Sequence, residues 1–271
     1  MEDIRLGVIG YGRMARAIVE PLLSRGELSA NHLCAVVGSR ARAEQLKQEL
    51  PDPVQVSSVC AAQAQDVWTM PIQLLAIKPQ QLDAVAASAP QLDQHPLLIS
   101  VLAGVTLGRL QRLFPAHRCV RAVPNTPALV GAGLTALAWG DQVNEQHKQH
   151  VMALFSSVSE VLELPEDKLD AFLALTSSGP AFIALAAEAM ADGAVASGLP
   201  RELAHRLAHR TLAGTAALLQ ERQLHPAALK DMVSSPAGTT MAGLRRLEQA
   251  GMRSALIEAI VAAAERSREL A

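Results

Sequence analysis

The sequence has few aromatic residues, few cysteines and no excess of charge of either sign. Aromatic side chains make up only 3% of its 271 residues, so we expect an interior built from small and aliphatic side chains. The formal net charge of −2 provides no strongly basic surface, which argues against nucleic acid as a partner. Charged residues make up only 18% of the chain, and this low share favours large buried interfaces.

The three cysteines, Cys34, Cys60 and Cys119, are odd in number and lack the spacing of metal ligands. Each lies in an apolar context, so we expect all three in the core. The sequence therefore predicts neither a disulfide framework nor a metal site, and it favours a reducing, cytoplasmic compartment.

The sequence also lacks an uninterrupted apolar run suited to crossing a membrane. Its two longest uncharged runs, residues 122–140 and 171–187, contain Pro-Asn-Thr-Pro and Ser-Ser-Gly-Pro, which we expect to break a helix. The acidic start at residues 1–3 is unlike the basic start of a secretory signal peptide. A soluble protein without a membrane partner is therefore predicted.

Ala, Leu and Val are abundant, and they are arranged in two different patterns. Up to about residue 163, short apolar runs alternate with helical stretches such as Met14–Ser24 and Leu107–Phe114. This alternation predicts an α/β fold with a doubly wound parallel sheet, whose last strands run antiparallel at its edge. The expected strands are Arg5–Ile9, Leu33–Val37, Leu74–Ile77, Leu97–Leu102, Cys119–Val123, Leu134–Trp139 and Val161–Leu164.

After Leu164-Pro165 the pattern changes to Ala- and Leu-rich stretches with helical spacing and no convincing strand. Turn residues at Gly179-Pro180, Gly198-Leu199-Pro200 and His225-Pro226 divide these stretches. We therefore predict two domains: a Rossmann-type domain over residues 1–164 and an all-helical domain over residues 165–271.

A glycine-rich turn joins the first expected strand to the first expected helix. Its core, residues 10–15, reads G-x-G-x-x-A. Gly10 permits a tight turn, Gly12 lets the backbone approach a pyrophosphate, and Ala15 lets helix and strand pack closely. The phosphates would meet the unpaired amides at the start of the helix. The motif by itself is common, and its place between strand and helix is what predicts a dinucleotide site.

The type of dinucleotide is encoded after the second strand. An NAD site has Asp or Glu there to bind the ribose 2′-hydroxyl, whereas an NADP site has Arg and small hydroxyls for the 2′-phosphate. Here Ser39-Arg40 is followed by Arg42, with no acid before Glu44. An arginine binds a phosphate that a carboxylate would repel, so NADPH is favoured over NADH. The alternative is that these arginines form only a solvated turn and helix start.

Two further segments lie where strands of such a sheet end, at the edge where ligands bind. They are Ala76-Ile77-Lys78-Pro79-Gln80 and Ser100-Val101-Leu102-Ala103-Gly104. Pro79 removes a backbone donor and shapes its turn, and Gly104 allows a close approach of backbone. Taken alone, each segment is explained by turn chemistry as well as by cofactor binding.

These motifs, in this order, resemble the pyrroline-5-carboxylate reductase family from residue 7 to residue 270. The stretch with the sequence Ser-Pro-Ala-Gly-Thr-Thr is the most specific, followed by Arg-x-x-Pro-Asn-Thr-Pro. The segments that carry the resemblance are Gly7–Ala15, Ala76–Gln80, Arg121–Pro127, Ser178–Phe182, Gly198–Pro200 and Ser235–Thr240.

The resemblance implies an NADPH-dependent oxidoreductase that reduces the C=N bond of 1-pyrroline-5-carboxylate to L-proline, the last step of proline biosynthesis. It also implies a homo-oligomer, either a dimer built through the helical half or a ring of such dimers. The cofactor-binding residues that it implies are Gly10, Gly12, Arg13, Met14, Ser39, Arg40, Ser58, Ala76, Lys78, Pro79, Ala103, Gly104 and Asn125.

The implied substrate is a small cyclic imino acid, which needs an anion cradle for its carboxylate and a hydrogen-bonding group near its nitrogen. The resemblance assigns the cradle to the backbone around Gly238 and assigns Thr240, as the catalytic residue, to the ring nitrogen. The substrate-binding residues that it implies are Ser235, Ala237, Gly238, Thr239 and Thr240. The alternative is that the hydroxyl side chains only cap the helix that follows.

The sequence departs from the family pattern at several positions, and two alternatives stay open there. One is a divergent paralogue that reduces a related cyclic imino acid, and the other is a paralogue that binds the cofactor without catalysis. The departures are Arg13 for Asn, Ser58 for a ribose-contacting Asn, Val123 for Met, Ser177 for Gly, Phe182 for Tyr and Ala237 for Gly.

Other clusters of functional residue types point to simpler roles. Reductases of 3-hydroxyacids use a lysine on the long inter-domain helix, and Gly179–Ser197 contains none. His205 and His209 are spaced i,i+4, but the metal-protease glutamate is missing, so a surface pair is favoured over a metal site. Glu188 and Asp192 have the same spacing, and a solvated or arginine-paired face is favoured over acid–base work.

Overall fold

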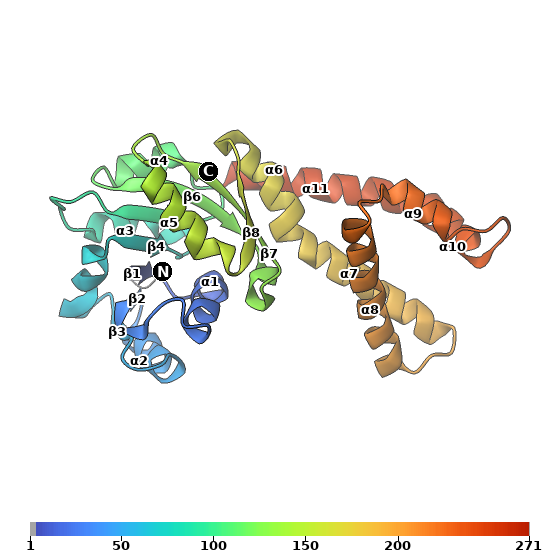
Figure 1. Ribbon diagram of the computed structural model, residues 1–271, viewed down its shortest axis with the longest axis horizontal. Helices are drawn as coiled ribbons and strands as arrows, with labels where there is room; N and C mark the ends of the chain where they lie inside the picture. The colour runs from blue at the N-terminus through green and yellow to red at the C-terminus, as the bar shows by residue number, and fades with distance from the viewer. Residues whose placement is uncertain (1–3, 271) are drawn as a thin grey trace. The chain divides into compact units, whose positions relative to one another are not determined.

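The computed structural model describes residues 4–270, which form two compact units (Figure 1). The first unit contains residues 4–177 together with residues 263–270, and the second contains residues 178–262. The acidic start at residues 1–3, on which the absence of a signal peptide was predicted, lies outside the described residues.

The first unit is built on an eight-stranded sheet with the strand order β3-β2-β1-β4-β5-β6-β7-β8. Neighbouring strands from β3 to β6 are parallel, in the order typical of a doubly wound dinucleotide-binding sheet. Strand β7 is antiparallel to β6, and β8 is parallel to β7, so the antiparallel edge that the sequence predicts is confirmed. The strands are β1 (Leu6–Ile9), β2 (Leu33–Val37), β3 (Gln55–Ser58), β4 (Ile72–Leu75), β5 (Leu97–Ser100), β6 (Arg118–Pro124), β7 (Gly133–Trp139) and β8 (Ser159–Glu163).

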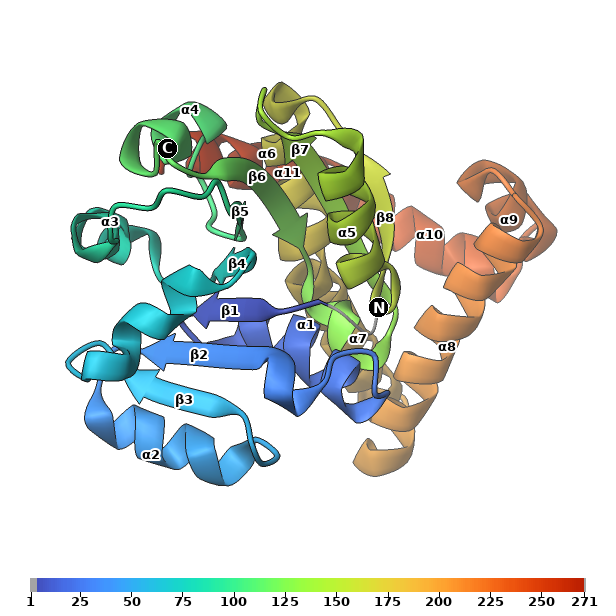
Figure 2. The ribbon, with the colours of Figure 1, turned by 60° about the vertical axis from the view of Figure 1, so that its left-hand side comes forward.

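Helices cover both faces of this sheet (Figure 2). Side chains alternate between the faces along each strand, so Leu6 and Val8 of β1 pack with Ile18, whereas Ile9 packs in a separate cluster with Leu110. The first cluster includes residues of α1, α2 and α5, and the second includes residues of α3, α4 and α6. The helices of this unit are α1 (Arg13–Ser24), α2 (Arg40–Glu49), α3 (Leu82–Ser88), α4 (Leu107–Leu113), α5 (Glu145–Ser156) and α6 (Leu169–Leu173). The predicted doubly wound α/β fold is therefore confirmed.

The sheet differs from the prediction at its β3 edge. Strand β3 is absent from the expected strands, because its sequence Gln-Val-Ser-Ser contains a single apolar residue and an edge strand buries little. Cys60 follows this strand in an exposed turn, so the expectation that all three cysteines are buried is wrong for Cys60. Burial is correct for Cys34 and Cys119, and it raises their thiol pKa values to about 11 and about 12.

The second unit is entirely helical. Helices α7 (Gly179–Ala196) and α8 (Arg201–Glu221) pack through small side chains, Ala191 against Ala204 and Ala208. They are followed by α9 (Pro226–Met232), α10 (Thr239–Gln249) and α11 (Met252–Glu269), and the last turns of α11 belong to the first unit.

Gly179-Pro180, predicted to interrupt the helices, does not do so. The backbone continues from α6 through a π-helical segment, Ala174–Ser178, into α7, and Pro180 is the second residue of α7, directly after the segment where the helical hydrogen-bond pattern changes. As a result, the helical segment Glu166–Ala196 is long and apolar enough to cross a membrane by length and composition alone. The expectation that residues 171–187 contain a break in the helix is therefore wrong. The absence of a membrane partner stays a prediction.

The two compact units divide at a different place from the predicted domains. The helical part of the chain begins near residue 166, as the sequence pattern suggests, but α6 packs on the sheet through the fully buried Leu169. The compact units therefore separate after residue 177. The boundary between a cofactor-binding domain and a substrate-binding domain at residues 164 and 165 stays a prediction.

Candidate active site

The turn between β1 and α1 has the geometry of a phosphate cradle. Gly10 has a φ of +86°, and a Cβ there would lie 2.8 Å from the carbonyl oxygen of Ala76, so only glycine suits the position. A Cβ on Gly12 would meet nothing within 4 Å, so the backbone is open at that point. Gly12 is the N-cap of α1 and supplies no side chain to the first-turn amides, which are left available for an anion.

The residues that follow Gly12 continue this cradle. Arg13 and Met14 form the first turn of α1, with Arg13 exposed and Met14 half-buried. Ala15 is fully buried where the helix packs against the sheet. Arg13, which replaces the Asn usual in the family, therefore adds a positive charge beside the open amides.

The turn after β2 carries the predicted determinant of NADPH. Ser39 is the N-cap of α2, and its hydroxyl accepts a hydrogen bond of 3.2 Å from the backbone amide of Arg42. Arg42 forms an ion pair of 3.4 Å with Glu49. Arg40 is exposed and has no carboxylate within ion-pair distance among residues 4–270. Of the two arginines considered, Arg40 is the one whose charge is available to a 2′-phosphate.

A cavity of about 840 Å³ lies between β3 and α2, and it brings two of the predicted cofactor residues together. Arg40 lines it at the start of α2, and Ser58 lines it at the carboxyl end of β3. Ser58 is 7% exposed, and Lys47 and Cys60 lie in the same lining. The lining also contains the carboxylates Glu44, Asp52 and Asp66, so its volume suits a ribose but its overall charge does not by itself select a phosphate.

Beyond β4, the carboxyl edge is shaped by backbone hydrogen bonds. The amide of Ala76 donates to Ile9 at 2.8 Å, which places this turn beside Gly10. Lys78 is exposed, its amide donates to the side chain of Gln81 at 3.1 Å, and Pro79 begins a 3₁₀ turn. Ala76, Lys78 and Pro79 therefore lie at the same edge of the sheet as the glycine-rich turn. Their contacts with the cofactor stay predictions.

Gly104 has a structural role that the sequence does not reveal. Its φ is +71°, and a Cβ there would lie 2.7 Å from the Cβ of Leu270. The close backbone approach predicted at Gly104 therefore occurs, and the segment that approaches Gly104 is the end of α11. Ala103 beside it is exposed, and the cofactor contacts of both residues stay predictions.

Asn125 ties two segments of the first unit together. Its side-chain amide donates to the carbonyl of Thr176 at 3.0 Å, and its oxygen accepts from the amide of Leu134 at 2.8 Å. The hydroxyl of Ser177, which replaces a family glycine, donates to Pro124 at 3.1 Å. These bonds hold the π-helical segment against the end of β6, and a cofactor contact of Asn125 stays a prediction.

Arg121, from the same motif, is 2% exposed and forms a buried ion-pair network. Its guanidinium lies 3.3 Å from Glu166 and 3.3 Å from Asp170. Asp170 also accepts a hydrogen bond of 2.7 Å from Ser267 of α11. The i,i+4 spacing of Glu166 and Asp170 is the sequence signal that points to this network, and the arginine fixes α6 and the end of α11 on β6.

In the second unit, the loop before α10 leaves a helix start open. Gly238 is the N-cap of α10, and no side chain caps its first turn. A Cβ on Gly238 would lie 2.3 Å from the hydroxyl of Ser235, and the Gly238 amide donates to the Ser235 carbonyl at 3.0 Å. The alternative that Ser235, Thr239 or Thr240 caps this helix is therefore not supported, because the open amides suit an anion instead.

The same loop explains one departure from the family. Ala237 has a φ of +58°, the left-handed conformation that glycine adopts without cost. An alanine there costs about 1–2 kcal/mol, which accounts for the glycine usual in the family. Thr240 is half-buried in the first turn of α10, and Ser235 and Thr239 are exposed.

The paired residues singled out in the helical half lie at the surface. Asp192 is exposed and forms a 2.7 Å ion pair with Arg201, in accordance with the arginine-paired face that we expected. The rings of His205 and His209 lie 6.4 Å apart on α8. Within residues 4–270, no three His, Cys, Asp or Glu side chains gather as metal ligands.

Two family models match the chain in its two halves. Residues 5–104 match the family described as NADP oxidoreductase, coenzyme F420-dependent, and residues 166–270 match pyrroline-5-carboxylate reductase dimerisation. The two matched ranges contain the glycine-rich turn and the loop before α10, respectively.

Full-length relatives connect the two halves. The chain is 45% identical to the pyrroline-5-carboxylate reductase of Synechocystis over 268 residues, which cover 99% of this chain and 98% of the relative. It is 39% identical to that of Thermus thermophilus over 98% of both chains. The crystal structure of Plasmodium falciparum pyrroline carboxylate reductase with NADP bound superposes with a TM-score of 0.85 at 26% identity, over 100% of this chain and 99% of that chain. The chain therefore belongs to the pyrroline-5-carboxylate reductase family.

Proposed function

We propose that the chain is an NADPH-dependent pyrroline-5-carboxylate reductase, which reduces the C=N bond of 1-pyrroline-5-carboxylate to give L-proline. This reaction is the last step of proline biosynthesis. The proposal rests on family membership, on relatives that carry this name and on the NADP bound in the Plasmodium relative. The observation of this chain that carries it is the open start of α10, because an uncapped helix start with a glycine cradle suits the substrate's carboxylate.

The residues of the loop before α10 divide the work of holding the substrate. The amides after Gly238 bind the carboxylate, and Ser235, Ala237 and Thr239 shape the loop around it. The hydroxyl of Thr240 hydrogen-bonds the ring nitrogen and orients the C=N bond. A protonated imine accepts hydride readily, so orientation is the main requirement and no strong acid is needed.

The cofactor is held by the first unit. Bound NADPH supplies the hydride. Gly10 and Gly12 let the backbone approach the pyrophosphate, and the first-turn amides of α1 donate to it. Arg40 pairs with the 2′-phosphate, and Ser39 shapes the turn that presents Arg40. The preference for NADPH over NADH follows from this arginine, because no carboxylate stands in its place.

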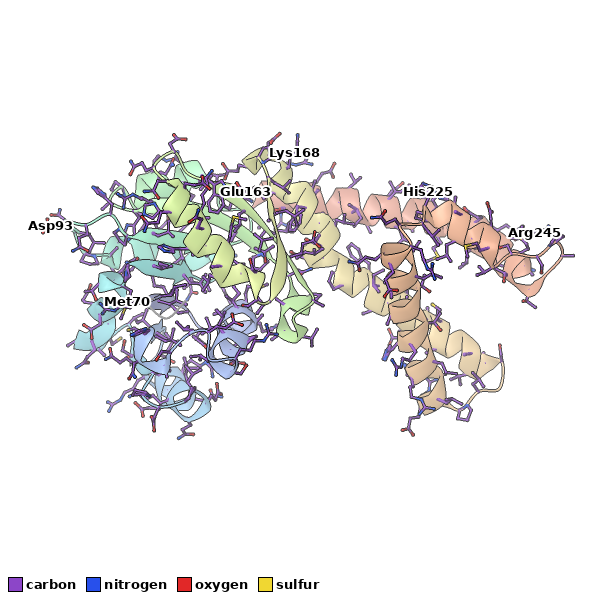
Figure 3. All side chains as sticks on the ribbon, in the orientation of Figure 1. Met70, Asp93, Glu163, Lys168, His225 and Arg245 are labelled. Atoms are coloured by element: carbon purple, nitrogen blue, oxygen red, sulfur yellow. The ribbon has the colours of Figure 1, made fainter. Side chains whose placement is uncertain are left out.

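The second unit is the dimerisation surface in this proposal. Its helices expose large apolar side chains, while only a few small residues such as Ala191, Ala204 and Ala208 are buried within it. Figure 3 draws the side chains that project from these helices. Single exposed apolar residues are normal, but so many on one helical unit mark an interface. The exposed ones include Ile183, Leu185, Met190, Leu207, Met232, Val233, Leu247, Ile257 and Val261. In this proposal a homodimer, alone or in a ring of dimers, buries these side chains. The proposed enzyme is soluble and cytoplasmic.

The reaction is tested by following NADPH oxidation with 1-pyrroline-5-carboxylate and with a panel of six-membered and sulfur-containing cyclic imines. We expect turnover with the first substrate and formation of proline. Binding of NADPH without turnover of any imine would identify a non-catalytic paralogue. Turnover confined to another ring would identify a divergent paralogue.

The role of Thr240 is tested by Thr240→Ala, with Thr211→Ala on α8 as the matched control. Loss of a hydrogen bond to a charged group costs about 1.5–3 kcal/mol, and misplacement adds to it, so kcat/KM should fall by roughly tenfold to a thousandfold. NADPH binding should change little in either variant. Parent activity in Thr240→Ala, measured on folded protein, would refute the assignment.

A further inference from the structure

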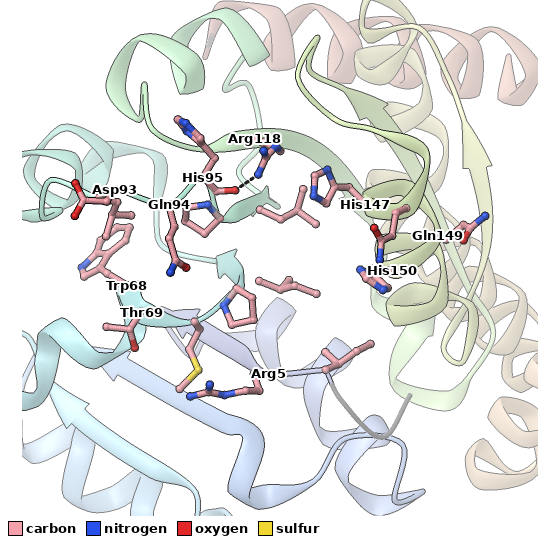
Figure 4. Close-up of a pocket in the computed structure, with 18 of the residues that line it drawn as sticks. Arg5, Trp68, Thr69, Asp93, Gln94, His95, Arg118, His147, Gln149 and His150 are labelled. Atoms are coloured by element: carbon pink, nitrogen blue, oxygen red, sulfur yellow. Dashed lines mark hydrogen bonds between the residues drawn. The ribbon is translucent and has the colours of Figure 1, made fainter.

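A second cavity lies at the opposite edge of the sheet from the glycine-rich turn. It has a volume of about 1130 Å³ and is bordered by the amino ends of β1, β4, β5 and β6 (Figure 4). Helix α5 forms one wall through residues of its first turns. Small-molecule pockets typically have volumes of about 300–1,000 Å³, so this cavity is large enough for an organic ligand.

Cationic and ionisable side chains line this cavity from four separate parts of the chain. Arg5 precedes β1, His95 precedes β5, Arg118 begins β6, and His147 and His150 lie on α5. Figure 4 shows Arg118, His147 and His150 around one part of the opening, with Arg5 on another side. Asp93 is the one carboxylate in the lining among residues 4–270. The lining therefore has an excess of positive charge.

Arg118 is held in place without being neutralised. Its guanidinium donates to the backbone carbonyl of His95, and no carboxylate lies within ion-pair distance of it in the described part of the chain. Burial and the neighbouring positive charge of Arg118 lower the pKa of His147, and His150 acts in the same direction. The field at this point therefore favours an anion.

The ring nitrogens of two histidines are set by their partners. Nδ1 of His95 lies 2.9 Å from the carbonyl oxygen of Ala116, so it carries the proton. Nδ1 of His147 accepts from the amide of Asn144 at 3.3 Å, so neutral His147 carries its proton on Nε2. His147 can thus donate a hydrogen bond to an anion even when it is uncharged.

The rest of the lining contains neutral polar side chains, among them Gln94 and Gln149, together with apolar ones. Trp68 and Met70 precede β4, Ile4 precedes β1, and Leu97 begins β5. Trp68, Met70 and Leu97 are almost fully buried, whereas Ile4 is half-buried and Pro71 is exposed, so the last two provide the apolar surface that a ligand can reach. A ligand that suits both parts of the lining carries an anionic group on an apolar body.

We propose that this cavity is a second binding site, for a small organic anion whose carboxylate or phosphate pairs with Arg118 and His147 and whose apolar body lies against Ile4 and Pro71. The site is separate from the cofactor cradle. Arg5 and Gly10 are five residues apart along extended backbone, which separates the two edges by about 17 Å. Ligand and NADPH can therefore be bound at the same time.

Phenyl phosphate and benzoate are suitable probes, because each joins an anionic group to an apolar ring. Their binding is measured by titration calorimetry on the full chain, with and without saturating NADPH. We expect saturable binding of phenyl phosphate in both conditions, weaker binding of inorganic phosphate, and no binding of the uncharged phenol.

Variants locate the site. Arg118→Gln should weaken phenyl phosphate binding at least tenfold, and His147→Gln should weaken it several-fold with little effect on folding, because its side chain is half-buried. Arg112→Gln, on the exposed surface of α4 outside the lining, is the matched control and should bind within twofold of the parent. The proposal is overturned if phenyl phosphate does not saturate at millimolar concentration, if NADPH displaces it, or if His147→Gln binds like the control.

Discussion

The burial of His117 predicts how the stability of the protein depends on pH. This histidine is 4% exposed, and its ring packs edge-on against Trp68 and Phe114 at centroid distances of 6.0 and 5.5 Å. Gln73 donates to the carbonyls of Trp68 and Met70, so its oxygen must accept the proton of His117 Nε2 at 3.0 Å. The histidine is thereby held neutral, and burial lowers its pKa to about 4.

The magnitude follows from linkage. The ordinary pKa of 6.5 applies to the unfolded chain, and the folded value is about 4. Between these two values the unfolded state binds the proton and the folded state does not, so stability falls as the pH falls from about 6.5 to about 4. Each pKa unit is worth about 1.4 kcal/mol, which gives a loss of about 3 kcal/mol from this residue alone.

The measurement is urea unfolding at a fixed protein concentration between pH 7 and pH 4, followed by the fluorescence of the two tryptophans, Trp68 and Trp139. The parent is compared with His117→Gln, and His150→Gln is the control because His150 is exposed. Gln cannot be protonated, so the stability gap between parent and His117→Gln should narrow by about 3 kcal/mol on acidification. A gap that stays constant across this range would refute the reasoning, and so would equal narrowing in the control.

Three further predictions concern the site and its supports. Arg40→Ala should lower kcat/KM for NADPH and leave that for NADH nearly unchanged; an unaltered preference in steady-state assays would show that Arg40 does not bind the 2′-phosphate. Gly10→Ala should weaken NADPH binding at least tenfold and destabilise the chain by about 1–2 kcal/mol, because φ is +86° there; cofactor titration and thermal unfolding measure both effects, and parent-like binding would contradict the cradle. Asp170→Asn should destabilise the first unit by about 3 kcal/mol, because the buried Arg121 loses a charged partner while Glu166 remains; denaturant unfolding measures it, and a change below about 1 kcal/mol would mean that Glu166 alone satisfies the arginine.

Local sequence patterns were sufficient for most of the fold. The glycines at positions 10 and 12 mark the end of β1 and the start of α1, because tight turns and open helix starts leave local signatures. Strand β3 was missed, because three of its four residues are polar and its pairing with β2 is a tertiary effect. The continuous helix through Pro180 was also missed, since a proline usually marks a break and the π-helical segment that precedes it has no local sequence signature.

The geometry of the candidate site was predictable where it depends on the local backbone, and less so where it depends on distant partners. The sequence pattern around Gly238 predicts an anion cradle, and the structure shows that no side chain caps the helix that follows, while binding of an anion there stays a prediction. Gly104 and Asn125 have partners, Leu270 and Thr176, that lie 166 and 51 residues further along the chain. Contacts across such separations leave no local pattern, so the structural uses of these two residues became visible only in the folded chain.

The discontinuity of the first unit has a consequence for how this protein is made. Its sheet is complete once residue 163 has been synthesised, but the contacts of Gly104 with Leu270 and of Asp170 with Ser267 require residues more than ninety positions further on. During translation the sheet can therefore form while part of its carboxyl edge waits for the end of α11. A chain that stops before residue 263 would lack these contacts, and that part of the carboxyl edge would stay uncovered until synthesis reaches Leu270.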